Sequence, residues 1–409
     1  MAHESSPAPL TSAERIDSLD LLRGFALLGI LLMNIQVFAM PGPAYTNPSN
    51  YGDLGGVNLW VWVLTHILAD QKFMSLFSML FGAGVCVFTE RAMEKTGHAA
   101  ALHYRRTFWL LVFGLIHAHL IWYGDILYSY ALCGLLLYLF RRLSPRALLI
   151  WSAVFLLVPA VYSGFIQWAM PYIPAEAKAG MMQSWAPPAE KIQAEVSGYQ
   201  GSWIEQQSQR HQSALMLETV VFAIHFFWRA MGMMLLGMAL YKLGVLSGRR
   251  PPAFYTRMLL IGAILGISLS AWGVHWNFSH GWSLEASMFG GSLFNYFGSI
   301  ALALAYVGLV IRLYQAQAAV GLQQRLRAVG RMAFSNYIAQ SLLCTFVFYG
   351  FGLGLFGQVE RWQQLLVVLA VWTLQLIWSP IWMRHFLFGP LEWLWRALSY
   401  MQRPRMRRV

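Results

Sequence analysis

Charged residues and cysteine are both scarce in this chain. Asp, Glu, Lys and Arg together make up 11% of its 409 residues, whereas an ordinary soluble protein carries about 25%. The three cysteines, Cys86, Cys133 and Cys344, lie in apolar stretches and form no CxxC pair. The low charge excludes a soluble globular enzyme. The cysteine pattern indicates neither a disulfide framework nor a zinc site, so we expect no bound metal.

Long apolar runs take the place of the missing charge. Hydrophobic residues make up 58% of the chain, in runs near the roughly 20 residues that a helix needs to cross a bilayer. Stretches such as LLLYLF and LVVLAVW are apolar on every face, which excludes the alternating strands of an outer-membrane barrel. We expect an all-α polytopic membrane protein, with a single transmembrane domain over residues 1–409. Its ten predicted transmembrane helices are residues 19–40, 71–89, 107–122, 126–140, 147–169, 219–241, 257–277, 290–314, 332–355 and 363–384.

The positive charges are distributed unevenly among the segments between these spans. If the amino terminus is cytoplasmic, 23 of the 29 Lys and Arg residues fall on the inside. This asymmetry predicts that both termini are cytoplasmic, N-in and C-in. Orientation in a membrane also accounts for the net charge of +12. We expect no nucleic-acid partner, because a basic module that reads a groove is absent.

Two segments outside the spans are distinctive. Residues 170–218 form an insertion of about 50 residues on the outer side, broken first by prolines and then typical of a short surface helix. Residues 386–409 form a cytoplasmic tail that combines an amphipathic helix with four closely spaced arginines. Such a tail contacts anionic headgroups, so membrane lipids are expected partners.

The first span carries polar residues on one stripe. Asp20, Arg23 and Asn34 share a helix face because eleven residues nearly complete three turns. One interpretation is that Arg23 and Asn34 line the inner and outer halves of an interior cavity. The alternative is that Asp17, Asp20 and Arg23 form a local ion-pair cap at the inner surface.

The densest group of titratable residues lies where the third and fourth spans meet, in GLIHAHLIWYGDILYSYAL. His117 and His119 precede a short turn at Gly124 and Asp125. Asp125 is placed to orient His117 as a general base, with Tyr128 one turn away. The alternative is that one histidine is a satisfied interior donor while the other faces headgroups.

The sixth span contains His225 and Arg229, which are four residues apart and share a helix face. A buried arginine needs a carboxylate or an anionic ligand, because an unpaired one is costly in hydrocarbon. Asp125, Asp70 and Glu218 are its expected partners.

The ninth span adds Asn336 and Gln340. These amides are candidates for binding a substrate. The alternative is packing, since amides also hydrogen-bond between membrane helices.

Several motifs, in this order, carry a resemblance to a known family. They are RIDSLDLLRGFALLGILLMNI, KFMSLFSMLFGAG, GLIHAHLIWYGDILYSYAL, LLGMALYKLGVL, RMAFSNYIAQSLLC and FGPLEWLWRALSY. Their order and spacing resemble the YeiB-like family of bacterial membrane proteins, a domain of unknown function. The resemblance implies a multi-pass protein of the bacterial inner (cytoplasmic) membrane.

That family is distantly similar to the transmembrane acyltransferases. In this comparison SLDLLRG, from Ser18 to Gly24, matches the start of the first catalytic-domain span, and Asn34 matches an asparagine near the active site. The catalytic histidine of those enzymes has no counterpart in residues 40–57, which contain no histidine. Acyl transfer therefore requires His117 or His119 to take its role.

Two functions remain open from the sequence. The first is a membrane acyltransferase that passes an acyl group from a cytoplasmic donor, such as an acyl-CoA held by Arg23, Arg105 and Arg106, to an acceptor at the outer face. The second is a transporter or binding protein for a small anionic or lipidic solute. The candidate catalytic residues are His117, Asp125 and Asn34. The candidate substrate-binding residues are Arg23, Arg229, His225, His119, Tyr128, Asn336 and Gln340.

Overall fold

The computed structural model describes residues 16–408. The rest of the predicted single domain, residues 1–15 and Val409, lies outside the described residues. Every regular element in residues 16–408 is a helix, apart from an isolated bridge between Phe386 and Arg407. The predicted all-α class is confirmed.

Seven helical stretches in the described residues are long and apolar enough to cross a membrane, by length and composition. Two shorter helices, α6 (Leu127–Phe140) and α15 (Ala333–Phe348), are also apolar. These helices identify a multi-pass membrane protein, while the count of ten spans stays a prediction. The seven stretches are α1 (Asp17–Ala39), α3 with α4 (Gly56–Leu68 and Lys72–Thr96), α7 (Pro145–Ala169) with η3 (Met170–Tyr172), α10, η4 and α11 (Gln207–Met216, Leu217–Phe226 and Phe227–Lys242), α12 (Pro252–Ser279), η5 with α13 (Leu284–Gly291 and Ser292–Gln315) and α16 (Arg361–His385).

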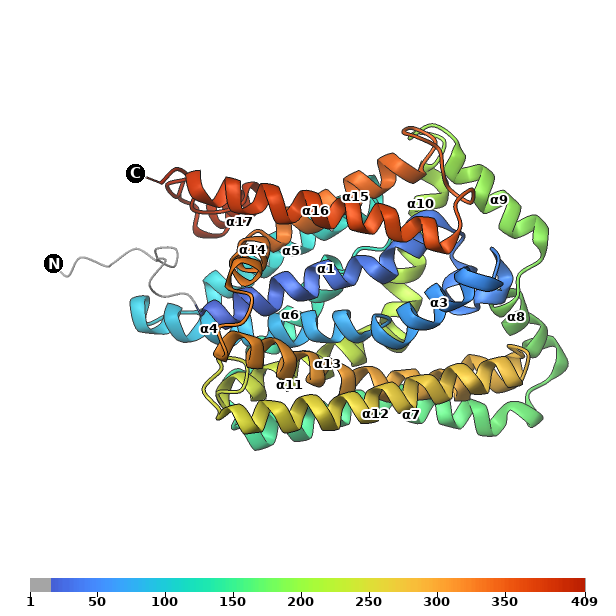
Figure 1. Cartoon of the computed structure of the whole chain (residues 1–409), viewed down its shortest axis with the longest axis horizontal. Coiled ribbons are helices and arrows are strands. Elements are labelled where there is room, and N and C mark those ends of the chain that lie inside the picture. Colours follow the sequence, from blue (N-terminus) through green and yellow to red (C-terminus); the bar gives the residue numbers. More distant parts are fainter. Residues whose placement is uncertain (1–15, 409) are drawn as a thin grey trace.

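The helices run along one axis, so the bundle has two ends (Figure 1). One end, called here the tail end, carries α14 (Val320–Arg331) and α17 (Pro390–Tyr400). The opposite end, called the insertion end, carries α8 (Ala175–Trp185) and α9 (Ala189–Gln200). Short helices α2 (Pro43–Thr46) and η2 (Pro48–Asn50) complete the list, together with α5 (Ala100–Leu120).

The insertion contains more helix than the sequence predicted. Pro174 and Pro188 were expected to break it, yet each stands at the residue before a helix, α8 and α9. A proline at the start of a helix loses no hydrogen bond, because the first amide groups have no partner within the helix.

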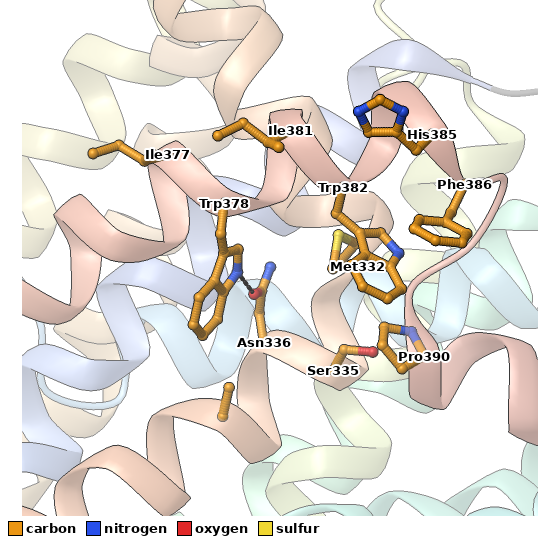
Figure 2. A pocket seen from close by; sticks show the side chains of 11 residues that line it. Met332, Ser335, Asn336, Ile377, Trp378, Ile381, Trp382, His385, Phe386 and Pro390 are labelled. Atoms are coloured by element: carbon orange, nitrogen blue, oxygen red, sulfur yellow. Dashed lines mark hydrogen bonds between the residues drawn. The ribbon is translucent and has the colours of Figure 1, made fainter.

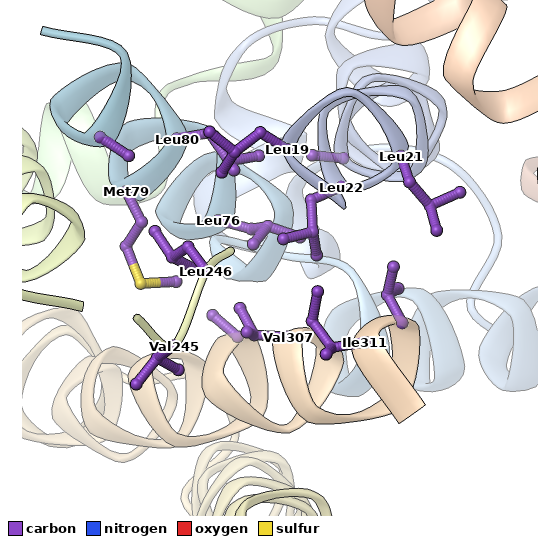
Figure 3. Packing of buried hydrophobic residues seen from close by; sticks show 14 of the residues in the cluster. Leu19, Leu21, Leu22, Leu76, Met79, Leu80, Val245, Leu246, Val307 and Ile311 are labelled. Atoms are coloured by element: carbon purple, nitrogen blue, oxygen red, sulfur yellow. The ribbon is translucent and has the colours of Figure 1, made fainter. Parts of the chain in front are cut away.

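Tight packing around α1 and α4 forms one of the main apolar cores. Leu22 of α1, Leu76 of α4 and Ile311 of α13 converge there (Figure 3). Beside it, α4 and α11 approach so closely that a Cβ atom on Gly82 would lie 2.0 Å from the Met234 carbonyl oxygen, and one on Gly237 would lie 1.9 Å from that of Met79. Small residues of this kind let membrane helices pack backbone to backbone.

The apolar stretch Gly56–Lys95 is interrupted just before the predicted span 71–89. Helix α3 ends at Leu68 and α4 begins at Lys72, and Gln71 between them has a left-handed φ of 63°. Irregular backbone is tolerated at membrane depth only where protein or a cavity surrounds it. A break in a helix inside a bundle therefore leaves backbone polar groups available to a binding site.

Candidate functional site

The His117 side chain lies near the end of α5, and Asp125 lies in the turn that leads to α6. His117 Nδ1 is 2.7 Å from Asp125 Oδ1, with the two side chains 1% and 2% exposed. The other carboxylate oxygen accepts from the backbone N–H of Tyr128 at 2.6 Å, at the first turn of α6. The turn thus brings the imidazole and carboxylate together and holds the carboxylate in place.

Ser341 of α15 completes this group, although it is not among the residues predicted from the sequence. Its Oγ lies 2.9 Å from His117 Nε2, and its side chain is buried. With Asp125 accepting from Nδ1–H, the other ring nitrogen is free to accept the Ser341 hydroxyl proton. The one signal for Ser341 in the sequence is its place beside Gln340, as a polar pair within an apolar span.

Asn34 and Arg23 do not join this group. Asn34 is half-buried and makes no side-chain hydrogen bond to the described residues. Arg23 Nη1 pairs with Asp20 Oδ1 at 3.0 Å, and its side chain is 31% exposed. The Asp20 pair supports the alternative of a local ion pair at the helix end, although Asp17 pairs with Arg327 instead; the cavity lined by Arg23 and Asn34 stays a prediction.

The arginines expected to hold an acyl-CoA are bound to the tail instead. Arg105 Nη1 donates to the Ser399 carbonyl oxygen at 3.2 Å. The Arg106 guanidinium lies 4.6 Å from the centre of the Phe88 ring and 3.9 Å from that of Trp395. With Arg23 paired to Asp20, all three arginines have protein contacts, and donor binding by them stays a prediction.

A second buried polar group surrounds the break between α3 and α4. Asp70 Oδ1 accepts from the Tyr45 hydroxyl at 2.6 Å, and its Oδ2 accepts from Asn295 Nδ2 at 2.8 Å. His66 Nδ1 lies 3.3 Å from the same Oδ2. This carboxylate therefore has partners from α3, α13 and the segment after α1.

Two buried cations lie in the same group. Lys72 donates to the amide oxygen of Asn295 and, at 2.8 Å, to the His66 carbonyl oxygen. Arg229 of α11 donates to Ser75 Oγ at 2.9 Å and to Ser299 Oγ at 2.5 Å. Both cationic side chains are fully buried. Their two positive charges face one carboxylate, that of Asp70.

The predicted ion pairs of Arg229 are wrong. Its guanidinium forms no ion pair with a described carboxylate, and instead covers the Tyr296 ring at 4.4 Å in addition to its serine contacts. Hydroxyl and carbonyl oxygens accept from its two Nη groups, while its buried Nε–H has no hydrogen-bond partner among the described residues. His225 packs edge-on against the same ring, with ring centres 5.8 Å apart, so the predicted shared face of His225 and Arg229 is present.

His119 and Tyr128 point away from the His117 group. His119 Nε2 lies 3.2 Å from Glu218 Oε2, and its Nδ1 lies 2.9 Å from that of His211. The Tyr128 ring packs against Phe222 at 6.0 Å between centres. Glu218 is therefore the partner of His119, although it was predicted for Arg229.

Asn336 and Gln340 form hydrogen bonds between helices, and their role in binding a substrate stays a prediction. Asn336 accepts from Trp378 Nε1 at 2.7 Å (Figure 2). It also donates to Ser379 Oγ at 3.0 Å. Gln340 donates to Gln375 Oε1 at 3.0 Å and to the Leu27 carbonyl oxygen at 3.3 Å. These bonds connect α15 to α16 and α1.

Comparison with known proteins identifies the family. The chain is 32% identical to the uncharacterized protein YxaH of Bacillus subtilis (strain 168), over 97% of each chain. It is 30% identical to the uncharacterized protein YeiB of Escherichia coli (strain K12), over 94% of this chain and 96% of that one. The chain belongs to the YeiB-like family. A family model described as protein of unknown function (DUF418) also matches residues 240–402.

The family model and the full-length relatives cover different parts of the two buried groups. The family model covers Ser341, whereas His117, Asp125, Lys72 and Arg229 precede residue 240. The full-length relatives span nearly the whole chain. Both buried groups therefore lie within the region shared with YxaH and YeiB.

Proposed function

We propose that this protein is a membrane acyltransferase of the bacterial inner membrane. Its ten helices cross with both termini inside, and it passes an acyl group from a cytoplasmic donor to an acceptor at the outer face. The observation that carries the proposal is the chain of contacts from Asp125 through His117 to Ser341, at 2.7 Å and 2.9 Å. A carboxylate, an imidazole and a hydroxyl in this order form the arrangement that activates a serine for acyl transfer.

The proposed reaction has two halves. Ser341 Oγ attacks the acyl carbonyl carbon of the donor while its proton passes to His117 Nε2, and Asp125 stabilises the imidazolium. The bond to the donor's leaving group breaks, and His117 returns the proton to that group. An acceptor hydroxyl then attacks the acyl-Ser341 ester, with its proton taken by His117 and returned to Ser341.

The proposal predicts that Ser341 reacts with a fluorophosphonate probe in membranes that contain the full chain. Labelling located at Ser341 by mass spectrometry should disappear in Ser341→Ala. In His117→Ala its rate should fall by about 10²–10⁴, the usual contribution of a general base.

The matched control is His103→Gln in the same helix. The His103 ring is buried and bonds the Gly134 carbonyl oxygen at 2.9 Å, so this variant tests loss of a buried histidine outside the site. Absence of labelling at Ser341, or equal labelling in His117→Ala, would contradict the proposal. As a second measurement, a deletion strain complemented with Ser341→Ala should lack an O-acyl modification of an envelope glycan or lipid that the wild-type chain restores.

A second candidate function is binding or transport of a small anion, and the Asp70 group supports it. Lys72 and Arg229 bring two buried positive charges against one carboxylate, and an uncompensated charge in a low-dielectric interior is costly. A bound carboxylate or phosphate would balance the charge at the break between α3 and α4.

Thermal unfolding of the purified chain in acetate, phosphate or chloride at equal ionic strength tests this second candidate. An anion that binds should raise Tm, because it stabilises only the folded state. The rise should disappear in Arg229→Leu and persist in Arg361→Lys, a buried arginine held by Gln36 and two carbonyl oxygens. A rise that is equal in Arg229→Leu, or no rise with any anion, would exclude anion binding by this group.

A further inference from the structure

A cavity of about 490 Å³ lies between α15 and α16 near the tail end. Its volume falls within the roughly 300–1,000 Å³ of small-molecule pockets. In Figure 2 Trp378 and Trp382 extend from α16 toward α15, and Met332 and Ser335 form the facing wall. The side chains of Ile377 and Ile381 on α16 are 49% and 50% exposed. The cavity is therefore a groove at the surface that the bundle presents to lipid.

The polar atoms of the two indoles and of Ser335 in the groove are already bonded to protein. Trp378 Nε1 donates to Asn336, and Trp382 Nε1 donates to the Phe388 carbonyl oxygen at 2.9 Å. The Ser335 hydroxyl donates to Glu392. The indole rings are thus fixed as apolar walls, and the His385 ring is the polar group at the rim.

The end of the groove is cationic. Backbone hydrogen bonds place Arg407 and Arg408 beside the rim of the groove. The Arg408 N–H donates to the His385 carbonyl oxygen at 3.0 Å, and Arg407 forms an isolated antiparallel β-bridge with Phe386. His385 and Phe386 both line the groove, and Arg407 and Arg408 are exposed. Glu392 is the only acidic residue after Glu360, and it is bonded to the first residues of α15.

We propose that this groove binds one acyl chain of an anionic phospholipid, with the headgroup against Arg407 and Arg408. The apolar groove matches the acyl chain of such a lipid, and the two exposed arginines at its end match the phosphate of the headgroup. This site is separate from His117 and from Asp70, so it does not depend on either proposed function.

Native mass spectrometry of the full chain, equilibrated with equal amounts of phosphatidylglycerol and phosphatidylcholine of the same acyl chains, tests the site. The wild-type chain should retain one phosphatidylglycerol in preference to phosphatidylcholine. Ala339→Phe places a ring in the groove and should abolish that retained lipid. The matched control is Leu342→Phe on the same helix, because Leu342 is 52% exposed and does not line the groove.

The charges are tested separately. Arg407→Gln with Arg408→Gln should lower the preference for phosphatidylglycerol by roughly 30-fold, about fivefold for each cation, and should leave binding of the chain intact. Arg403→Gln is the control, because its guanidinium lies 5.7 Å from the Trp393 ring. Equal retention of both lipids by the wild type, or an unchanged phosphatidylglycerol adduct in Ala339→Phe, would overturn the proposal.

Discussion

Buried arginines in this protein are held by neutral oxygens. Arg229 bonds two serines, Arg361 bonds Gln36 and the carbonyls of Pro48 and Tyr51, and Arg210 bonds two glutamines. A guanidinium carries five donors in a fixed fork, so several weak acceptors can replace one carboxylate. The cost of an unpaired charge correctly predicts that partners exist, but it does not identify them.

A residue outside the spans provides a pH prediction. Glu195 of α9 accepts from the Gly42 backbone N–H at 2.9 Å, and burial raises the pKa of its carboxyl above the usual value. The folded state therefore holds this proton more tightly than the unfolded state, so folding is favoured at low pH and loses stability as pH rises through the folded pKa. Glu195→Gln should remove that loss.

Thermal unfolding in detergent between about pH 5 and about pH 8 measures this effect. The increase in Tm of Glu195→Gln over the wild type should grow with pH. Glu205→Gln is the control, because hydrogen bonds from Ser202 lower the pKa of that carboxyl. A gain that is constant with pH would contradict the assignment to Glu195.

Among the elements, the break between α3 and α4 has an energetic cost that a substitution can measure. Gln71 adopts a φ of 63°, a conformation that costs a non-glycine residue about 1–2 kcal/mol. Its side-chain oxygen is also buried without a hydrogen bond in the described structure. Gln71→Gly should raise the free energy of unfolding by about 1 kcal/mol after the entropy of glycine is subtracted.

The comparison is Gln71→Ala, measured by denaturation of the purified chain. Alanine removes the same side-chain oxygen but keeps the Cβ atom, so the Gln71→Ala protein should be less stable than the Gln71→Gly protein. Equal stability of the two variants would show that the backbone at this break is not strained.

The tail helix α17 is attached to α15 through the Glu392 carboxylate and through the Leu391 backbone N–H, which donates to Ser335 Oγ at 3.0 Å. Glu392 Oε1 accepts from the Phe334 and Ser335 backbone N–H groups at 2.7 and 3.2 Å, where the helix dipole favours negative charge. Glu392→Ala leaves these buried donors without that partner, which costs about 1–3 kcal/mol. We expect faster hydrogen exchange across Pro390–Tyr400, with Glu94→Ala on the exposed end of α4 as the control. Unchanged exchange in Glu392→Ala would mean that other contacts hold α17.

In the whole molecule, α1 lies between two halves. On one side it packs against α4 and α13 in the core around Leu22, and on the other its Leu27 joins the apolar cluster of Leu110 and Tyr337. The Asp70 group lies in the first half, and the His117 group lies in the second. The two candidate sites are therefore built from different helices around a shared central one.

Topology is the prediction that belongs to the whole chain. The excess of Lys and Arg on one side predicts a cytoplasmic carboxyl terminus and an outer insertion. Alkaline phosphatase, which is active only outside the cytoplasm, should be inactive when fused after Val409. It should be active when inserted at Gly180 of α8, where a Cβ atom would have no neighbour within 4 Å. The reverse pattern would invert the proposed orientation.

The sequence by itself determined the helical class, and it predicted the approach of His117 to Asp125 that the structure shows. Apolar runs in lipid must satisfy their backbone groups internally and so form helices, and eight residues with one turn bring His117 and Asp125 together. Only the tertiary structure decided that Ser341, 224 residues away, completes that group, that serines hold Arg229, and that Asn336 joins α15 to α16. Membrane helices associate through van der Waals packing and through hydrogen bonds between segments that are distant in sequence. The hydropathy of the chain does not indicate which helices become neighbours.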